Sequence, residues 1–188
     1  KDAAASGGEK AVEAAKAAGW DKIEAAYIAG VQGDSTNTAR MDGYREGITE
    51  AGGEFLDNET QYANATADLA VTAMEGIMSK FPDGVAIICS NNDDMALAAA
   101  RTAKSNPNYA KTIFLGFDGQ KSACEAVAAG ELTMTAAQNN FDIGYKAVET
   151  MVKILKGEQY DKVVDTGTEI ITKDNAEERL TKFNEWMK

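Results

Sequence analysis

Residues 112–120 read TIFLGFDGQ, a short apolar run that leads into Gly-Phe-Asp-Gly. A helical pattern follows from residue 121. An apolar run of this length, ended by glycine and followed by a helix, is typical of a parallel strand buried on both faces. Ligands of open α/β sheets bind just beyond the carboxyl ends of the strands. The stretch therefore predicts that Asp118 lies at the ligand-binding edge of a parallel sheet.

Outward from this stretch, strand and helix patterns alternate along the whole chain. Strands are predicted at residues 22–29, within 54–62, and at 85–89, 112–117, 132–137, 162–165 and 168–172. Helices are predicted at residues 6–18, 37–51, 66–81, 95–104, 121–129, 141–156 and 175–187. This alternation favours an α/β fold with a doubly wound parallel sheet, helices on both faces and right-handed crossovers.

Composition excludes several classes of function. The chain has 188 residues, enough for one domain or for one domain and part of another, and a formal net charge of −11. No cluster of Lys and Arg supplies the basic face that nucleic acid requires, so we expect no nucleic-acid partner. No apolar run reaches the length of a membrane span, and no signal peptide is visible. Histidine is absent, which removes the commonest metal ligand and the commonest general base.

The two cysteines, Cys89 and Cys124, have two interpretations. Free cysteine is commonly a small buried hydrophobe, and this interpretation is favoured. A disulfide remains open if the protein is exported to an oxidising compartment. Their spacing does not match a metal site.

Four polar side chains follow predicted strands at the point where each strand ends. Arg40 lies early in the helix after the first strand, Asn92 follows residues 85–89, Asp118 follows residues 112–117, and Gln138 follows residues 132–137. Strand ends of a parallel sheet lie side by side, so we expect these groups to converge. A guanidinium, two amides and a carboxylate can satisfy the vicinal hydroxyls of a sugar, because each hydroxyl both donates and accepts hydrogen bonds.

Each of these residues also has a local explanation. Asn92 and Asp93 could cap a helix, Asp118 could be a turn residue, Arg40 could be solvated on a helix surface, and Gln138 could lie in an ordinary loop. Asp93 and Asp118 could also form an acid/base pair of the kind used by glycosidases. Asn92, Asp93 and Asp94, together with Asp118, could hold a divalent cation through their oxygens. No calcium-loop spacing and no activated nucleophile accompanies them, so we expect no enzyme, no metal and no cofactor.

These motifs resemble the periplasmic sugar-binding proteins of ABC transporters, type I, and within that family the ribose-binding-protein-like members. The motifs that carry the resemblance are TNTAR at 36–40, SNNDDMAL at 90–97, LGFDG at 115–119, LTMTAAQ at 132–138 and the helical stretch 144–157. The resemblance implies a two-lobed protein that closes on one monosaccharide. It implies hydroxyl-binding roles for Arg40, Asn92, Asp118 and Gln138, with Thr36, Tyr62 and Asp93 as additional candidates.

The same resemblance implies a division of the chain. Residues 7–137 would be the C-terminal ligand-binding lobe, residues 138–166 a segment that returns to a mostly missing N-terminal lobe, and residues 167–188 a C-terminal strand and helix. The apolar face of the helix at 141–156 would then lack its partner, and we expect the chain to self-associate. Family members stack an aromatic ring on the sugar from a position that is Ala65 here, and Tyr62 is the nearest ring.

The function implied by the resemblance is that of the solute-binding component of a bacterial ABC sugar importer. Its partners would be a pentose or hexose and the membrane permease. It would lie outside the cytoplasm, in the periplasm or lipid-anchored on the cell membrane. The alternative is the sugar-effector-binding domain of a transcriptional regulator of the lactose-repressor family.

Overall fold

The computed structural model describes residues 1–186, and its centre is one seven-stranded sheet. The strands are β1 (Glu24–Ala29), β2 (Glu54–Phe55), β3 (Gln61–Tyr62), β4 (Ile87–Ser90), β5 (Ile113–Asp118), β6 (Met134–Gln138) and β7 (Thr168–Ile171). Their order is β2-β1-β4-β5-β6-β7, and β3 also pairs with β1. Every pairing is parallel except that of β6 with β7, which is antiparallel. The predicted fold class is confirmed, with one antiparallel edge strand that the sequence pattern did not reveal.

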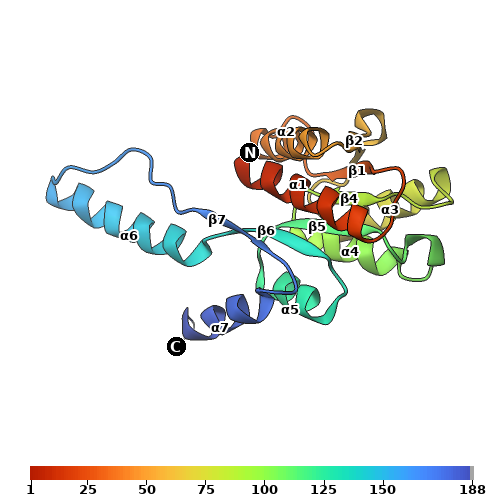
Figure 1. Ribbon diagram of the computed structural model, residues 1–188. Helices are drawn as coiled ribbons and strands as arrows, with labels where there is room; N and C mark the ends of the chain where they lie inside the picture. The colour runs from red at the N-terminus through yellow and green to blue at the C-terminus, as the bar shows by residue number, and fades with distance from the viewer. Residues whose placement is uncertain (187–188) are drawn as a thin grey trace.

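Helices cover both faces of the sheet, as Figure 1 shows. They are α1 (Asp2–Ala17), α2 (Ser35–Glu50), α3 (Ala67–Lys80), α4 (Asp93–Ala103), α5 (Lys121–Ala129), α6 (Asn140–Lys156) and α7 (Ala176–Trp186), with short 3-10 turns at Asp57–Glu59 and Pro107–Tyr109. Helices α1 and α2 pack on one face, whereas α3, α4, α5 and α7 pack on the other. Only α6 lies away from the sheet among these helices.

The chain reverses its direction across the sheet between β1 and β4. From β1 it crosses through α2 to β2 at one edge, and α3 then brings it back to β4 on the other side of β1. Strands β5 and β6 follow in order. The carboxyl ends of β1, β4, β5 and β6 therefore lie side by side at a topological switch point, the place where open α/β sheets bind ligands. Asp118 ends β5 at this edge, as the sequence predicted.

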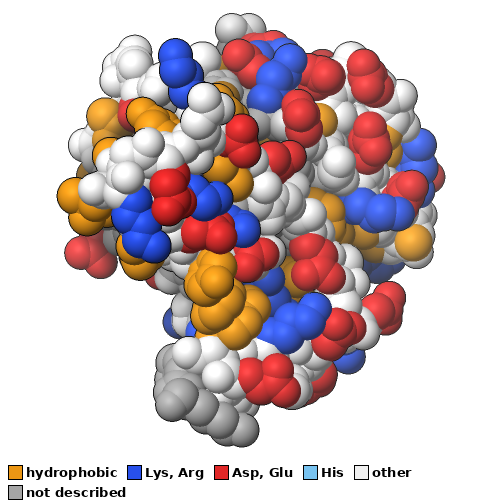
Figure 2. Space-filling model, turned by 90° about the vertical axis from the view of Figure 1, so that its left-hand side faces the viewer, with side chains coloured by type: hydrophobic (Ala, Val, Ile, Leu, Met, Phe, Trp, Pro, Cys, Tyr) orange, Lys and Arg blue, Asp and Glu red, His pale blue; other side chains and the backbone are white. Residues whose placement is uncertain are grey.

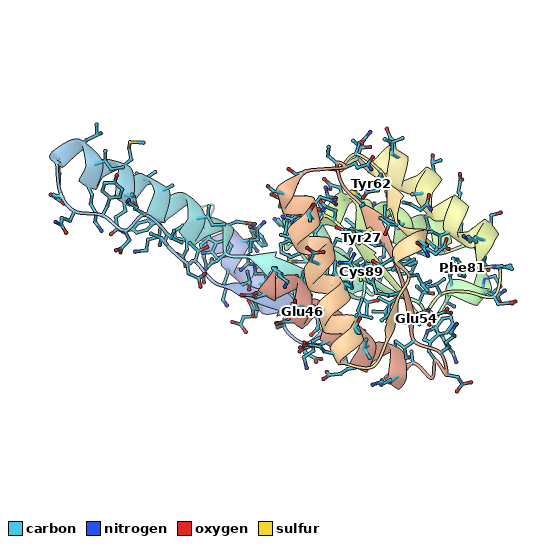
Figure 3. The ribbon with its side chains drawn as sticks, turned by 90° about the horizontal axis from the view of Figure 1, so that it is seen from above. Tyr27, Glu46, Glu54, Tyr62, Phe81 and Cys89 are labelled. Atoms are coloured by element: carbon cyan, nitrogen blue, oxygen red, sulfur yellow. The ribbon has the colours of Figure 1, made fainter. Side chains whose placement is uncertain are left out.

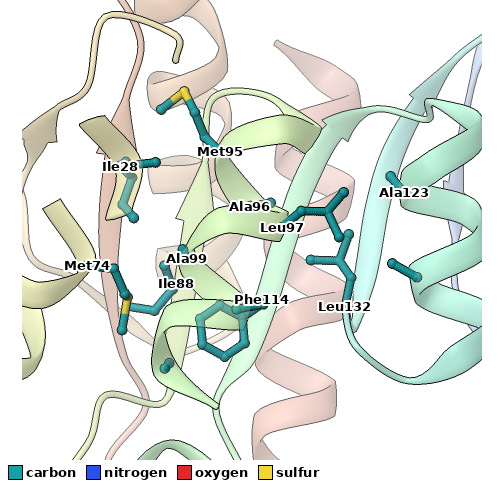
Figure 4. Close-up of a cluster of buried hydrophobic side chains, with 14 of the residues drawn as sticks. Ile28, Met74, Ile88, Met95, Ala96, Leu97, Ala99, Phe114, Ala123 and Leu132 are labelled. Atoms are coloured by element: carbon teal, nitrogen blue, oxygen red, sulfur yellow. The ribbon is translucent and has the colours of Figure 1, made fainter. Parts of the chain in front are cut away.

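Two apolar clusters, one on each face of the sheet, form the core. Figure 4 shows part of one of them, in which Ile28, Ile88 and Phe114 of the strands meet Met74 of α3 and Leu97 of α4. Cys89 belongs to one cluster and Cys124 to the other. Both thiols are free and buried, so the interpretation as buried small hydrophobes is confirmed.

Two predicted elements are wrong or only partly formed. No strand forms at residues 162–165, where Val163 is 86% exposed and has no sheet edge to join. Two adjacent valines, Val163 and Val164, suggested a strand there, but the segment runs back outside the sheet. Within residues 54–62, two-residue strands flank a 3-10 turn. The predicted end of the last helix at residue 187 lies outside the described residues, and α7 is described to Trp186.

Helix α6 extends away from the body in both views of the ribbon, in Figure 1 and, seen from above, in Figure 3. None of its residues is buried. Val148 is 66% exposed and Leu155 is 79% exposed, so the apolar face predicted from the sequence is open to solvent. Figure 2 looks at the molecule from the side on which α6 projects, and apolar side chains are visible on that surface. No helix among the described residues is both long and apolar enough to cross a membrane.

Helices α1 and α2 approach each other closely because glycines line their contact. A Cβ added at Gly47 would overlap the backbone of Ala5, and one added at Gly43 would overlap the backbone of Lys1. The contact matters for the site, because α2 carries Arg40. By contrast, Gly76 in α3 has nothing within 4 Å of the position of an added Cβ.

Gly47 and Gly76 make a matched test of the contact between α1 and α2. We expect Gly47→Ala to lower the free energy of unfolding by about 1–3 kcal/mol, because overpacking must separate the two helices. Gly76→Ala should instead raise it by about 0.5–1 kcal/mol, because alanine loses less entropy than glycine in an exposed helix. Urea unfolding followed by circular dichroism measures both. Equal effects of the two variants would contradict the packing described.

Candidate functional site

Three of the four predicted site residues meet at the carboxyl edge of the sheet. Arg40 Nη2 donates to Asp118 Oδ1 over 2.8 Å, and Gln138 Nε2 donates to the same oxygen over 2.7 Å. The Arg40 side chain is 12% exposed and that of Asp118 is 23% exposed. The three side chains come from α2, β5 and β6, so the sheet topology brings together groups that lie up to 98 residues apart, from 40 to 138.

The Arg40 guanidinium is fixed on three sides. Besides its bond to Asp118, its Nη1 donates to the backbone oxygen of Asn91 over 2.6 Å, which ties α2 to the end of β4. Its guanidinium carbon lies 4.0 Å from the centre of the Phe117 ring, in cation–π geometry. Charge-assisted bonds of this kind hold planar groups in a defined orientation. Arg40 is therefore preorganised rather than a solvated helix residue.

Asp118 has a strained backbone and one open oxygen. Its φ is 112°, in the region that favours glycine, and Gly119 follows with φ 68°. A non-glycine residue held there costs about 1–3 kcal/mol, and such residues occur where the surroundings fix them for function. In the described part of the chain, the hydrogen bonds to the Asp118 carboxylate both reach Oδ1, while Asn140 Nδ2 donates to its backbone oxygen over 3.4 Å. Oδ2 is left as an acceptor at the half-open edge.

Asn92 is both a helix cap and a part of this edge. Its Oδ1 accepts from the backbone N–H of Met95 over 2.9 Å at the start of α4. Its Nδ2 donates to the backbone oxygen of Ala65 over 3.2 Å. Asn64 and Ala65 both have positive φ, so Asn92 ties down an unusual loop before α3. No bond between Asn92 and the other three residues is present in the described region.

Asp93 lies underneath the site and does not reach its surface. Its side chain is fully buried, Oδ1 accepts from Thr135 Oγ1 over 2.6 Å, and Oδ2 accepts from the backbone N–H of Gln120 over 2.7 Å. Burial raises the pKa of Asp93 to about 7, and the nearby charge of Asp118 adds to this rise. The two hydrogen bonds act in the opposite direction and lower the pKa. The carboxyl group thus anchors the loop that follows Asp118.

The remaining candidates lie at the rim. Thr36, Arg40, Phe117 and Gln138 line a hollow of about 400 Å³ that also meets the N-terminal residues and the segment before β7. Tyr62 is 44% exposed in β3, next to the end of β1, and Figure 3 shows it at the periphery of the body. Among the described residues, no hydrogen bond joins the side chain of Thr36 or Tyr62 to Arg40 or Asp118.

A buried polar network behind Arg40 was missed by the sequence analysis. Asn37 Oδ1 accepts from the backbone N–H of Gly30 over 2.7 Å and from Asn91 Nδ2 over 2.9 Å. Asn91 Nδ2 also donates to Tyr27 Oη over 3.1 Å. The network joins the ends of β1 and β4 to the start of α2, where Arg40 lies. Asn37 and Asn91 stood within the quoted motifs, but a sequence cannot tell which amide turns inward.

The chemistry offered by this edge is that of hydrogen bonding. The half-open groups are a carboxylate oxygen, a guanidinium and two amides, which suit neutral polyhydroxylated ligands. No group of three or more His, Cys, Asp or Glu side chains able to hold a metal ion occurs among the described residues. Asp93 is sealed from the edge, so in this structure it cannot act on a ligand together with Asp118.

Comparisons with known proteins identify the family of this chain. A family model described as a periplasmic binding protein domain matches residues 1–159. The ribose import binding protein RbsB of Haemophilus influenzae is 30% identical over 152 residues, which are 81% of this chain and 50% of that protein. The D-allose-binding periplasmic protein of Escherichia coli is 31% identical over 129 residues, which are 69% of this chain and 41% of that protein.

Solved structures have the same fold. A solute-binding protein of Actinobacillus succinogenes with bound D-allose superposes with a TM-score of 0.83 at 22% identity, covering 94% of this chain and 61% of that one. A solute-binding protein of Bacillus halodurans with bound myo-inositol has a TM-score of 0.80 at 25% identity, covering 94% and 60%.

The chain spans about half the length of the curated relatives that it matches. The family model covers most of the chain, and it covers the strand ends that carry Arg40, Asn92, Asp118 and Gln138. Strands β1 to β6, the switch point and the polar edge lie within that range, whereas β7 lies beyond it. This chain belongs to the periplasmic binding protein domain family, among the type I sugar-binding proteins.

Proposed function

We propose that this chain provides one side of a monosaccharide site in the solute-binding component of an ABC sugar importer. Arg40, Asn92, Asp118 and Gln138 are the residues proposed to bind sugar hydroxyls. The observation that carries the proposal is the Asp118 carboxylate, held by Arg40 and Gln138 through one oxygen while the other stays open. An ionised acceptor held at a half-open edge can accept a hydroxyl without first reorganising.

Sugar hydroxyls need both donors and acceptors, and the edge offers both. Asp118 is an acceptor, Arg40 is a donor, and the amides of Asn92 and Gln138 carry one acceptor and one donor group each. Hydrogen bonds to charged groups contribute about 1.5–3 kcal/mol, roughly twice those between neutral groups. We propose that Asp118 and Arg40 contribute most of the affinity and that the amides contribute to the choice of sugar.

We propose that closure of two lobes completes the site. In this proposal residues 7–137 form the lobe that carries the polar edge. The C-terminal strand and helix are proposed to belong to the same lobe, since β7 pairs with β6 and α7 packs beside α5. Residues 138–166, with the exposed face of α6, are proposed to belong to a second lobe. Closure about the connecting residues would then cover Asp118 from the other side, as in hinge-closing binding proteins.

The proposed partner in transport is an ABC permease in the membrane, and the proposed location is outside the cytoplasm. The support is the relatives' names, which describe import binding and periplasmic proteins. The relatives are binding proteins, so we propose recognition without turnover.

The first prediction of the proposed function tests the role of Asp118 in sugar binding. We expect isothermal titration of the protein, prepared at the full length of its relatives, to detect binding of at least one sugar from a panel of pentoses and hexoses that includes D-ribose and D-allose. Asp118→Asn should weaken this binding by about tenfold to a hundredfold, because it removes the charge from a hydrogen-bond acceptor.

The matched control is Asp83→Asn, which makes the same change of charge in the exposed turn before β4, at the opposite end of the strand. This variant should bind as tightly as the parent. Unchanged affinity in Asp118→Asn, or no binding of any sugar in the panel, would contradict the proposed function.

Asp93 is proposed as a support for the site rather than a ligand contact, and its raised pKa makes a second prediction. In the folded chain its carboxyl holds a proton up to about pH 7, whereas in the unfolded chain it releases the proton near its ordinary value of 3.8. The stability that depends on this group is therefore present below about pH 4 and is lost as the pH rises to about 7.

Urea unfolding at a series of pH values measures this effect as a difference between two proteins. The free energy of unfolding of the parent, minus that of Asp93→Asn, should fall between about pH 4 and pH 7 and become constant above it. Taking the difference removes the titration of the other groups. A difference that is constant across this range would show that Asp93 titrates normally.

The third prediction concerns the exposed face of α6. We propose that the 188-residue chain self-associates, because Val148, Val152 and Leu155 remain open to solvent. Sedimentation velocity should show the apparent mass rising with concentration. Val148→Lys combined with Leu155→Lys should reduce the association, whereas two lysines on the polar side of α3, Asp68→Lys and Glu75→Lys, should not. A monomer at every concentration would count against this proposal.

A further inference from the structure

Helix α7 contains a buried arginine that the proposed sugar site does not use directly. Arg179 is 5% exposed, although α7 otherwise carries mostly polar and charged residues. Its Nε has no hydrogen-bond partner among the described residues, and no salt bridge to Arg179 is present there. Burying a guanidinium is costly unless it is compensated. The helix also lies beyond residue 159, where the match to the family model ends.

The compensating contact of Arg179 is at the connection between β6 and α6. Its Nη2 donates to the backbone oxygen of Gln138 over 2.6 Å. Gln138 is the last residue of β6, and α6 begins at Asn140. The side chain of the same Gln138 donates to Asp118. Arg179 therefore holds the backbone of the residue whose amide holds the central carboxylate.

A stack of aromatic rings continues from Arg179 onto α6. The Arg179 guanidinium carbon lies 5.0 Å from the centre of the Trp186 ring and 5.3 Å from that of Phe183. The Trp186 ring stacks on Phe141 with centres 5.5 Å apart and planes 17° apart. Phe141 in turn stacks on Tyr145, with centres 6.2 Å apart. Residues of α7 and of the first turns of α6 thus form one cation–π and aromatic column.

Helix α7 is itself anchored on the lobe. Ala176 is buried in the core cluster, and Leu180 and Phe183 pack against that cluster. Asn175 fixes the start of the helix, because its Oδ1 accepts from the Thr172 N–H and its Nδ2 donates to the Ile170 oxygen in β7. A contact made by Arg179 is therefore made from the rigid lobe. The column connects that lobe to α6 across a connection of one residue, Asn139.

We propose that Arg179 is a positioning residue of the hinge. It fixes the backbone of Gln138, and through Trp186 and Phe141 it sets the direction in which α6 leaves the lobe. Loss of the guanidinium frees α6 to move relative to the sheet and lets the Gln138 amide move away from Asp118. The expected effect on sugar affinity rests on the proposed function. The expected effect on the direction of α6 does not.

Fluorescence of Trp186 tests the proposed effect of Arg179 on α6, which does not depend on sugar binding. The chain has two tryptophans, so Trp20→Phe leaves Trp186 as the single emitter. In this background, Arg179→Gln should lower the native-state anisotropy of Trp186 and shift its emission to the red, because the ring leaves the column. The matched control is Lys182→Gln, which removes a charge from the same helix, where Lys182 pairs with Glu178 on the helix surface.

A second variant changes the aromatic column at its α6 end. Phe141→Leu, at a half-exposed position of α6, should produce the same loss of anisotropy without disturbing the buried guanidinium. This variant decides the question if Arg179→Gln does not fold. Arg179→Gln or Phe141→Leu with lower stability but unchanged anisotropy would overturn the proposal, since that result describes a residue with a structural role only.

Sugar titration supplies the second readout. Arg179→Gln should weaken binding by about tenfold, and Arg179→Lys, which keeps a charged donor, should recover part of the loss. Loss of anisotropy with unchanged sugar affinity would overturn the coupling to Gln138. If no sugar binds even to the parent, the proposed function fails, and the fluorescence result alone decides the role of Arg179 at α6.

Discussion

The candidate site depends on the backbone conformation of Asp118, which a non-glycine residue seldom adopts and which the surrounding contacts must hold. Arg40 and Gln138 hold its side chain, and the buried Asp93 and Thr135 hold the loop after it, since Gln120 N–H donates to Asp93 and Gly119 N–H donates to Thr135. Gly119 must be glycine, because a Cβ there would overlap Ala137. The strain at Asp118 is offset by these contacts, and the result is a fixed carboxylate with one open oxygen.

Contacts farther from the site also hold the Asp118 carboxylate in place, because they fix the helix that carries Arg40. The network of Asn37, Asn91 and Tyr27 fixes the start of α2, and α2 in turn places Arg40 over Phe117. The close glycine contact of α1 with α2 fixes the other side of the same helix. A buried polar network that is fully bonded orients its members more tightly than isolated hydrogen bonds do. Binding residues on such a support lose little conformational entropy when a ligand arrives.

Much of this arrangement could be predicted from the sequence, and the failures have physical reasons. The alternation of apolar strands with helices predicted the doubly wound sheet, and the Gly-Phe-Asp-Gly turn placed Asp118 at its edge, because buried parallel strands have a clear apolar signature. The sequence could not show which of Asn92 and Asp93 faces the edge of the sheet. At the start of a helix, a shift of one residue decides which side chain points outward and which is buried. The valines at 163 and 164 suggested a strand because periodicity carries no information about whether a sheet edge is available. Arg179 gave no sequence signal, because an arginine on a polar helix is usually exposed.

We propose that the open oxygen of Asp118 receives a sugar hydroxyl. A crystal structure of the protein with the sugar that it binds most tightly tests this proposal. We expect a sugar hydroxyl oxygen within about 2.5–3.0 Å of Asp118 Oδ2, with Arg40 and Gln138 still beside the same carboxylate. A sugar bound elsewhere, or an Asp118 whose two oxygens are both bonded to protein groups in the complex, would contradict it.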